Sequence, residues 1–183
     1  MYMSERLQRT ARRYHLEAGR CVRGKAYLAA CVMQGAALEG LLQAMCFLYP
    51  EQVKKTVVFQ RKQKRGFRRK RYRALELKYG ELINIAAELE WFPPRRFVVW
   101  GRRTNLAGFV HELRELRNYV HPGVWAPERE PQKFTKVVFD AVFEIFEGAN
   151  NWLLDHVHRS IRRQMEREER RAAKSALQPA GCA

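Results

Sequence analysis

Residues 25–50 read KAYLAACVMQGAALEGLLQAMCFLYP, and this stretch decides the expected fold. Apolar side chains occupy most of its positions, which predicts an α-helix that is buried on most of its circumference. Pro50 ends this helix, because a proline within a helix removes a hydrogen bond and clashes with the preceding turn. Small residues in its middle would let another helix approach closely: Ala29, Ala30, Gly35, Ala36, Ala37 and Gly40.

Helical periodicity continues on both sides of this stretch, and no strand is expected. Helices are predicted at 4–20, 25–49, 74–90, 104–121 (with Thr104 or Asn105 as the N-cap) and 132–170. The expected fold is all-α, an antiparallel bundle of four to five helices with a basic insertion (54–73) after the second. We expect a single domain over residues 1–170 and a flexible C-terminal tail over 171–183.

The charge of the chain favours a polyanionic partner. It has 35 Lys and Arg against 19 Asp and Glu, a formal net charge of +16. Such a field attracts nucleic acid first and an anionic membrane surface second. The basic insertion alone holds eleven Lys and Arg and no acidic residue. Phe59, Phe67 and Tyr72 lie among these charges and could stack on unpaired bases. The residues predicted to contact RNA are Arg61, Lys62, Lys64, Arg65, Arg68, Arg69, Lys70, Arg71 and Arg73.

The cysteines and apolar runs indicate a cytoplasmic protein without a membrane segment. The longest apolar runs, near 26–49 and 137–153, are interrupted by polar residues and fall short of the roughly 18 apolar residues of a span. The N-terminus lacks the apolar block of a secretory signal. Cys21, Cys31 and Cys46 lie on or beside the expected core, and Cys182 lies in the tail. Buried free thiols suit a reducing cytosol, and no zinc site is expected.

The helix at 104–121 gathers reactive side chains on one side. Arg114, Arg117 and His121 share one face at its C-terminal end, Asn118 lies four residues after Arg114, and His111 extends the row by one turn. RNA cleavage without a metal needs a group that moves protons near neutral pH, which histidine supplies. It also needs a cation that stabilises charge on the phosphate, which a guanidinium supplies through a two-point contact.

Three segments resemble a known family, the HEPN-domain proteins. LRELRNYVHPG (113–123) resembles the Arg-Asn…His signature of that family. GAALEGLL (35–42) is similar to its early core helix, which often carries an acidic residue at the place of Glu39. LKYGELINIAAEL (77–89) resembles the helix between these two elements in many members. The likeness covers roughly residues 25–155.

The resemblance implies a function. HEPN proteins include homodimeric, metal-independent and cofactor-free ribonucleases, many of them toxins or abortive-infection effectors against phage. Carried over by position, Arg117 would bind the phosphate, Asn118 would be its polar partner and His121 the acid or base. Glu39 is expected to pair with Arg114 or Arg117, since an unpaired carboxylate in an apolar helix is unfavourable. His111 is a supporting residue or a surface one. An antitoxin or defence-complex partner is also implied.

One spacing departs from the family pattern, which usually leaves four to six residues between arginine and histidine. Arg117 and His121 enclose three residues, whereas Arg114 and His121 enclose six. Either Arg114 is the functional arginine, or the chain belongs to a branch with the shorter spacing and less certain activity. The rival interpretations are a catalytically inactive HEPN protein that binds RNA or acts as a scaffold, a DNA-binding regulator, and a helix-end histidine that only caps carbonyl groups.

Overall fold

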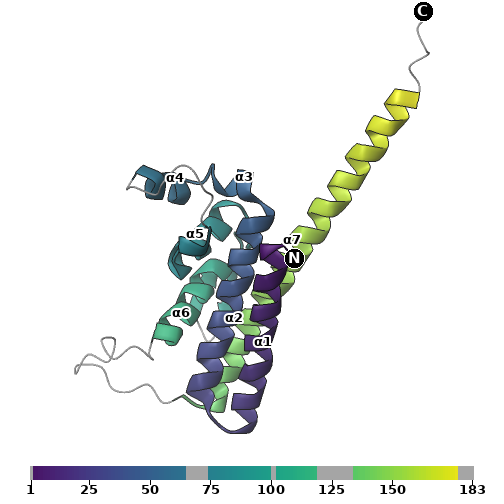
Figure 1. The fold of residues 1–183 in the computed structure, drawn as a ribbon. Coiled ribbons are helices and arrows are strands. Elements are labelled where there is room, and N and C mark those ends of the chain that lie inside the picture. The colour runs from purple at the N-terminus through teal and green to yellow at the C-terminus, as the bar shows by residue number, and fades with distance from the viewer. Residues whose placement is uncertain (1, 65–73, 100–101, 119–133, 177–183) are drawn as a thin grey trace, which may run out of the picture.

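The computed structural model describes residues 2–64, 74–99, 102–118 and 134–176. Within these ranges the chain is mostly helical (Figure 1), which confirms the all-α prediction. Its elements are α1 (Met3–Arg23), α2 (Tyr27–Leu48), α3 (Pro50–Val53), α4 (Val57–Lys64), the 3₁₀ helix η1 (Ala74–Glu76), α5 (Tyr79–Glu88), β1 (Arg96–Val99), β2 (Arg102–Asn105), α6 (Leu106–Asn118) and α7 (Lys136–Ala176).

Helix α2 is the centre of the bundle. It contacts α1, α5, α6 and α7, and Figure 1 shows α1 lying antiparallel beside it. The predicted burial is confirmed, since Ala30, Cys31, Leu38 and Leu42 are fully buried. The predicted role of its small residues is also confirmed. A Cβ atom on Gly40 would lie 3.3 Å from the Cβ of Ala11 in α1, so the two helices touch almost backbone to backbone.

Length and hydropathy alone would let α2 cross a membrane. The polar residues within the helix, Gln34, Glu39 and Gln43, are the reason that the sequence predicts no membrane segment. Half of the most apolar window of α2 is buried against the rest of the protein, and core helices of soluble proteins pass the same test. This apolarity is therefore weak evidence for a membrane segment.

The expectation of no strand is wrong. Strands β1 and β2 form an antiparallel pair in which Phe97 faces Thr104 and Val98 faces Arg103. Adjacent β-branched residues after Pro93 and Pro94 favour this extended backbone over a helix. As a consequence, α6 begins at Leu106. The Oδ1 atom of Asn105 accepts a hydrogen bond from the backbone N–H of Gly108 (2.9 Å), so Asn105 is the N-cap, one of the two predicted residues.

Three other boundaries differ from the prediction. The basic insertion contains the helix α4, which was not predicted, and the expected helix at 74–90 is divided into η1 and α5. Helix α7 continues to Ala176, six residues beyond the predicted end at 170. In Figure 1 its C-terminal half extends away from the bundle. The predicted division into a domain and a tail stays a prediction.

Two of the core cysteines should be chemically inert in the folded protein. Burial raises the pKa of Cys31 and of Cys46 to about 12, from an ordinary 9.0. Because the thiolate is the reactive form, near neutral pH their alkylation by iodoacetamide should be about a thousandfold slower than for a free thiol. Cys21 is only half-buried and should react faster. Mass spectrometry of the peptides measures this, and modification of all three at one rate would contradict it.

Candidate active site

An ion pair between α2 and α6 is the first feature of the candidate site. The Nη1 atom of Arg117 lies 2.9 Å from Oε2 of Glu39, and the two side chains are 31% and 20% exposed. The expectation that Glu39 pairs with Arg114 or Arg117 is thereby confirmed, and the partner is Arg117. Burial raises the pKa of Glu39, and the guanidinium of Arg117 opposes this shift. The pair therefore fixes the guanidinium at the end of α6.

Tyr79, at the start of α5, supports the same guanidinium. The Cζ atom of Arg117 lies 5.7 Å from the centre of the Tyr79 ring, a distance suited to a cation–π contact. Burial and the nearby carboxylate of Glu39 raise the pKa of Tyr79, so the phenol stays neutral. Its hydroxyl has no hydrogen-bond partner among the described residues. Arg117 is thus held by a carboxylate on one helix and an aromatic ring on another.

Two glycines allow α6 to pack this closely. A Cβ atom on Gly35 would lie 2.9 Å from Cδ2 of Leu113 and 3.3 Å from Cβ of Arg117. A Cβ atom on Gly80 would lie 2.9 Å from Nη1 of Arg114. A larger residue at Gly35 would press on buried Leu113 and on the Cβ atom of Arg117, and so on α6 itself, whereas one at Gly80 would displace the guanidinium of Arg114. Gly35 therefore sets the approach of α2 to α6 at Arg117, and Gly80 leaves room for the side chain of Arg114.

Arg114 lies one turn before Arg117 and has different contacts. Its Nη2 atom pairs with the neighbouring Glu115, whose side chain is 56% exposed. Its Nε atom is buried without a hydrogen-bond partner in the described part of the chain. Arg114 therefore packs over Gly80 and ends at the surface, whereas Arg117 is anchored between helices.

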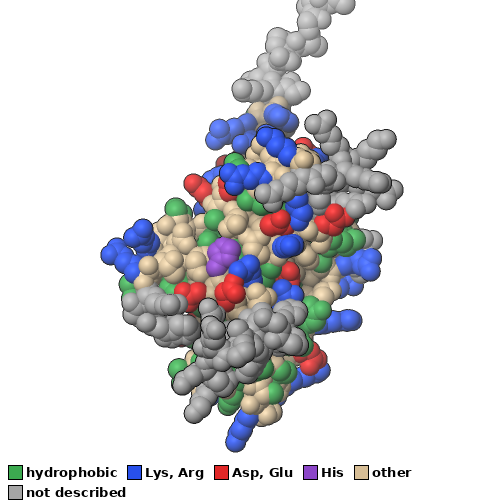
Figure 2. Space-filling model, turned by 90° about the vertical axis from the view of Figure 1, so that its left-hand side faces the viewer, with side chains coloured by type: hydrophobic (Ala, Val, Ile, Leu, Met, Phe, Trp, Pro, Cys, Tyr) green, Lys and Arg blue, Asp and Glu red, His purple; other side chains and the backbone are tan. Residues whose placement is uncertain are grey.

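His111 completes the row on α6. A ring nitrogen, Nε2, lies 3.1 Å from Oδ1 of Asn84 in α5. Burial and the charge of Arg114 lower its pKa, so the ring is neutral near pH 7. Figure 2 shows the side of the molecule formed by α4, α5 and α6, where a histidine lies among Lys, Arg, Asp and Glu side chains. His111 is part of a polar connection between α5 and α6.

The other predicted catalytic residues lie at the edge of the described chain. Asn118 is the last described residue of α6 and is half-buried. His121 lies outside the described residues, so its approach to Arg117 stays a prediction. Within the described residues, no group of three His, Cys, Asp or Glu side chains could hold a metal ion.

The predicted RNA-contacting residues are described only in part. Arg61 and Lys64, in α4, are exposed. Lys62 instead forms an ion pair with Glu81 (2.5 Å from Nζ to Oε2) and donates a hydrogen bond to the carbonyl of Glu76 (2.6 Å). It thereby ties α4 to α5, which gives it a structural contact in addition to its predicted role. The remaining predicted contacts lie outside the described residues: Arg65, Arg68, Arg69, Lys70, Arg71 and Arg73.

Sequence reasoning missed Tyr79, Asn84 and Gly80. The apolar periodicity of 77–89 predicts a core helix, and nothing in its spacing shows that its first turn faces Arg117. No family model, curated protein or solved structure matches the chain.

Proposed function

We propose that this protein is a metal-independent endoribonuclease of the HEPN type, which acts as a homodimer. The observation that carries the proposal is the ion pair between Glu39 and Arg117, with Tyr79 beneath the guanidinium. An arginine held in this way loses little side-chain entropy when it binds an anion, since its orientation is already fixed. The resemblance of residues 113–123 to the HEPN signature supports the same assignment.

The chemistry follows from the donors that Arg117 keeps. A guanidinium has five N–H groups, and the bond from Nη1 to Glu39 leaves others for a phosphate. These donors would stabilise the charge that develops on the phosphate oxygens as a ribose 2′-hydroxyl attacks phosphorus. His121 would take or give the proton, and Asn118 would orient the imidazole or the phosphate. Each chain supplies one such histidine, so a second copy would provide separate acid and base.

The biological setting in this proposal is that of a cytoplasmic toxin or phage-defence effector, restrained by an antitoxin or a larger complex. Expression in bacterial cells tests it. The wild type is expected to arrest growth and fragment cellular RNA, whereas His121→Ala at matched protein level does neither. Equal growth of the two strains, or equal arrest, would overturn the proposal.

A second candidate is a catalytically inactive HEPN protein that binds RNA or acts as a scaffold. The observation that favours it is that Arg117 already neutralises Glu39, combined with the short spacing from Arg117 to His121. This function predicts salt-sensitive RNA binding that survives His121→Ala and weakens in Arg61→Gln/Lys64→Gln. The nuclease function requires in addition that RNA is cut.

A further inference from the structure

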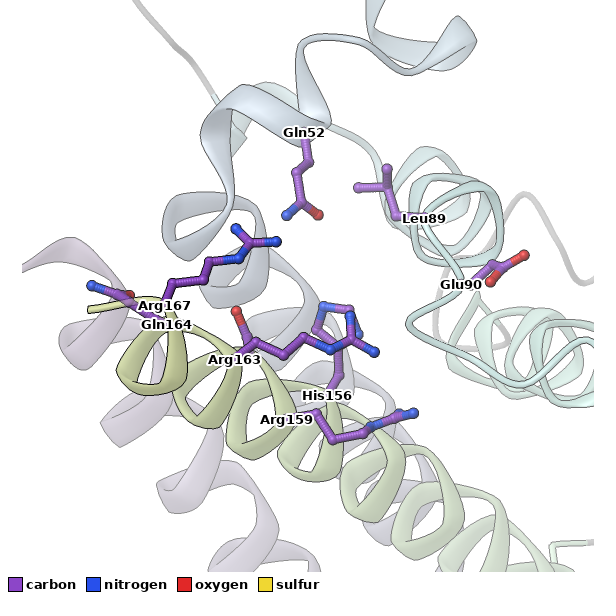
Figure 3. Close-up of a pocket in the computed structure, with 9 residues that line it drawn as sticks. Gln52, Leu89, Glu90, His156, Arg159, Arg163, Gln164 and Arg167 are labelled. Atoms are coloured by element: carbon purple, nitrogen blue, oxygen red, sulfur yellow. The ribbon is translucent and has the colours of Figure 1, made fainter. Parts of the chain in front are cut away.

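A second concave site lies away from the Glu39–Arg117 pair and shares no residue with it. It is a cleft of about 530 Å³ between α3, the C-terminal end of α5 and the middle of α7. Gln52 and Glu90 lie on one side of it, and His156, Arg159, Arg163 and Arg167 on the other. In Figure 3 the three arginines lie on the α7 side of the cleft, Arg167 points toward Gln52, and Leu89 and Glu90 border the opposite side.

The three arginines, named here the arginine ladder, repeat every four residues. Successive members therefore lie about 6 Å apart along the helix axis and on neighbouring parts of one face. Arg159 pairs with Asp155 (3.2 Å). Arg163 and Arg167 form no ion pair with any carboxylate of the described residues. Like charges four residues apart on a helix repel each other. A bound anion would reduce this repulsion between the arginines.

His156, which lines the cleft, packs against two aromatic rings behind it. The ring of His156 meets the ring of Tyr49 edge-on at 5.3 Å between centres, and lies 6.3 Å from that of Trp91. Burial, with the charges of Arg159 and Arg163, lowers the pKa of His156. The ring is therefore neutral in the free protein, and an anion in the cleft would favour its protonation.

We propose that this cleft binds the phosphate groups of a single-stranded RNA through the arginine ladder. The choice of RNA rests on the proposed function. The choice of an extended polyanion rests on the repeat of the ladder and on the place of the cleft in the chain, since α3, which carries Gln52, is followed directly by the basic insertion. Arg61 and Lys64 are exposed on α4, the helix that follows α3. RNA bound in this cleft would contact the protein at a site separate from the proposed catalytic residues. The cleft would thereby contribute to the affinity for the substrate.

Binding of a labelled 2′-O-methyl RNA tests the proposal, because this strand has no 2′-hydroxyl that can attack and measures affinity without cleavage. Arg163→Gln/Arg167→Gln removes two charges from the cleft. The matched control, Arg170→Gln/Arg171→Gln, removes two charges from exposed positions further along α7. We expect the first variant to bind at least about tenfold more weakly, with the salt slope lowered by about one to two, and the control to bind within about threefold of the wild type. RNA binding should also raise the pKa of His156. An NMR titration of its ring proton, with and without RNA, measures this shift.

Other outcomes separate this inference from the proposed function. Equal loss in the two variants, or no loss in either, would overturn the cleft as an RNA site even if the wild type cuts RNA. If the wild type binds RNA through the arginine ladder but cuts no RNA, the cleft is supported as an RNA-binding site and the proposed nuclease function is wrong. Ladder-dependent binding to vesicles containing phosphatidylserine, without binding to RNA, would assign the cleft to a membrane surface and contradict the proposal.

Discussion

Replacing Arg117 by lysine is expected to slow RNA cleavage about 10²–10³-fold, the loss typical of removing one group that stabilises transition-state charge. Lysine keeps the positive charge and can still neutralise Glu39. A single ammonium cannot, however, donate to that carboxylate and make a two-point contact with a phosphate at the same time. Single-turnover cleavage of a labelled RNA measures the effect, and circular dichroism checks that the bundle is folded.

Arg114→Lys is the matched control for this prediction. Arg114 lies on the same helix one turn earlier, and its Nη2 atom pairs with an exposed neighbour, Glu115. We expect Arg114→Lys to cost less than about tenfold in rate, because this ion pair lies at the surface and is weak. The opposite order, a large loss at Arg114 and a small one at Arg117, would make Arg114 the functional arginine. It would also match the longer arginine-to-histidine spacing that is usual in HEPN proteins.

The second large effect concerns packing. Gly35→Ala is expected to destabilise the protein by about 1–3 kcal/mol, the usual cost of overfilling a packed interior. The new methyl group would lie 2.9 Å from Leu113, which is fully buried, and 3.3 Å from the Cβ atom of Arg117. Relief requires α6 to move away from α2, which lengthens the contact between Glu39 and Arg117. Urea unfolding measures the stability, and the cleavage rate of the folded variant should fall as well.

Gly19→Ala provides the control for Gly35→Ala because it makes the same change in another helix. A Cβ atom there would meet only the Nη1 atom of Arg23, at 3.8 Å. Without a clash, the better helix propensity of alanine should stabilise the protein by about 0.5–1 kcal/mol. The two substitutions should therefore have opposite signs. Stabilisation by both would show that α2 and α6 are not packed as closely as described.

Part of the site could be predicted because local physical rules determine it. An acidic residue within an apolar helix requires a cationic partner, and Glu39 has one in Arg117. Small residues within a buried helix indicate close neighbours, which Gly35 and Gly40 have in α6 and α1. Asn105 caps α6 through a contact within four residues of chain. Each of these inferences needs only the spacing of residues along one helix.

The rest depends on contacts between elements that are distant in sequence. Tyr79 lies 38 residues before Arg117, and no periodicity shows that its ring supports that guanidinium. Strands β1 and β2 are four residues each, too short for alternation to be recognised within an arginine-rich stretch. The arginine ladder on α7 resembles any solvated helical face until α3 and the end of α5 are placed opposite it. Charge and spacing alone cannot distinguish a solvated face from a binding cleft.

The central claim is that a guanidinium and an imidazole of this chain act on one RNA phosphodiester. The most direct measurement is the chemistry of the RNA ends after incubation with purified protein in EDTA. The wild type is predicted to leave 2′,3′-cyclic phosphate and 5′-hydroxyl ends, and His121→Ala to leave the RNA intact. RNA that stays intact with the wild type, or identical products from both proteins, would contradict the claim.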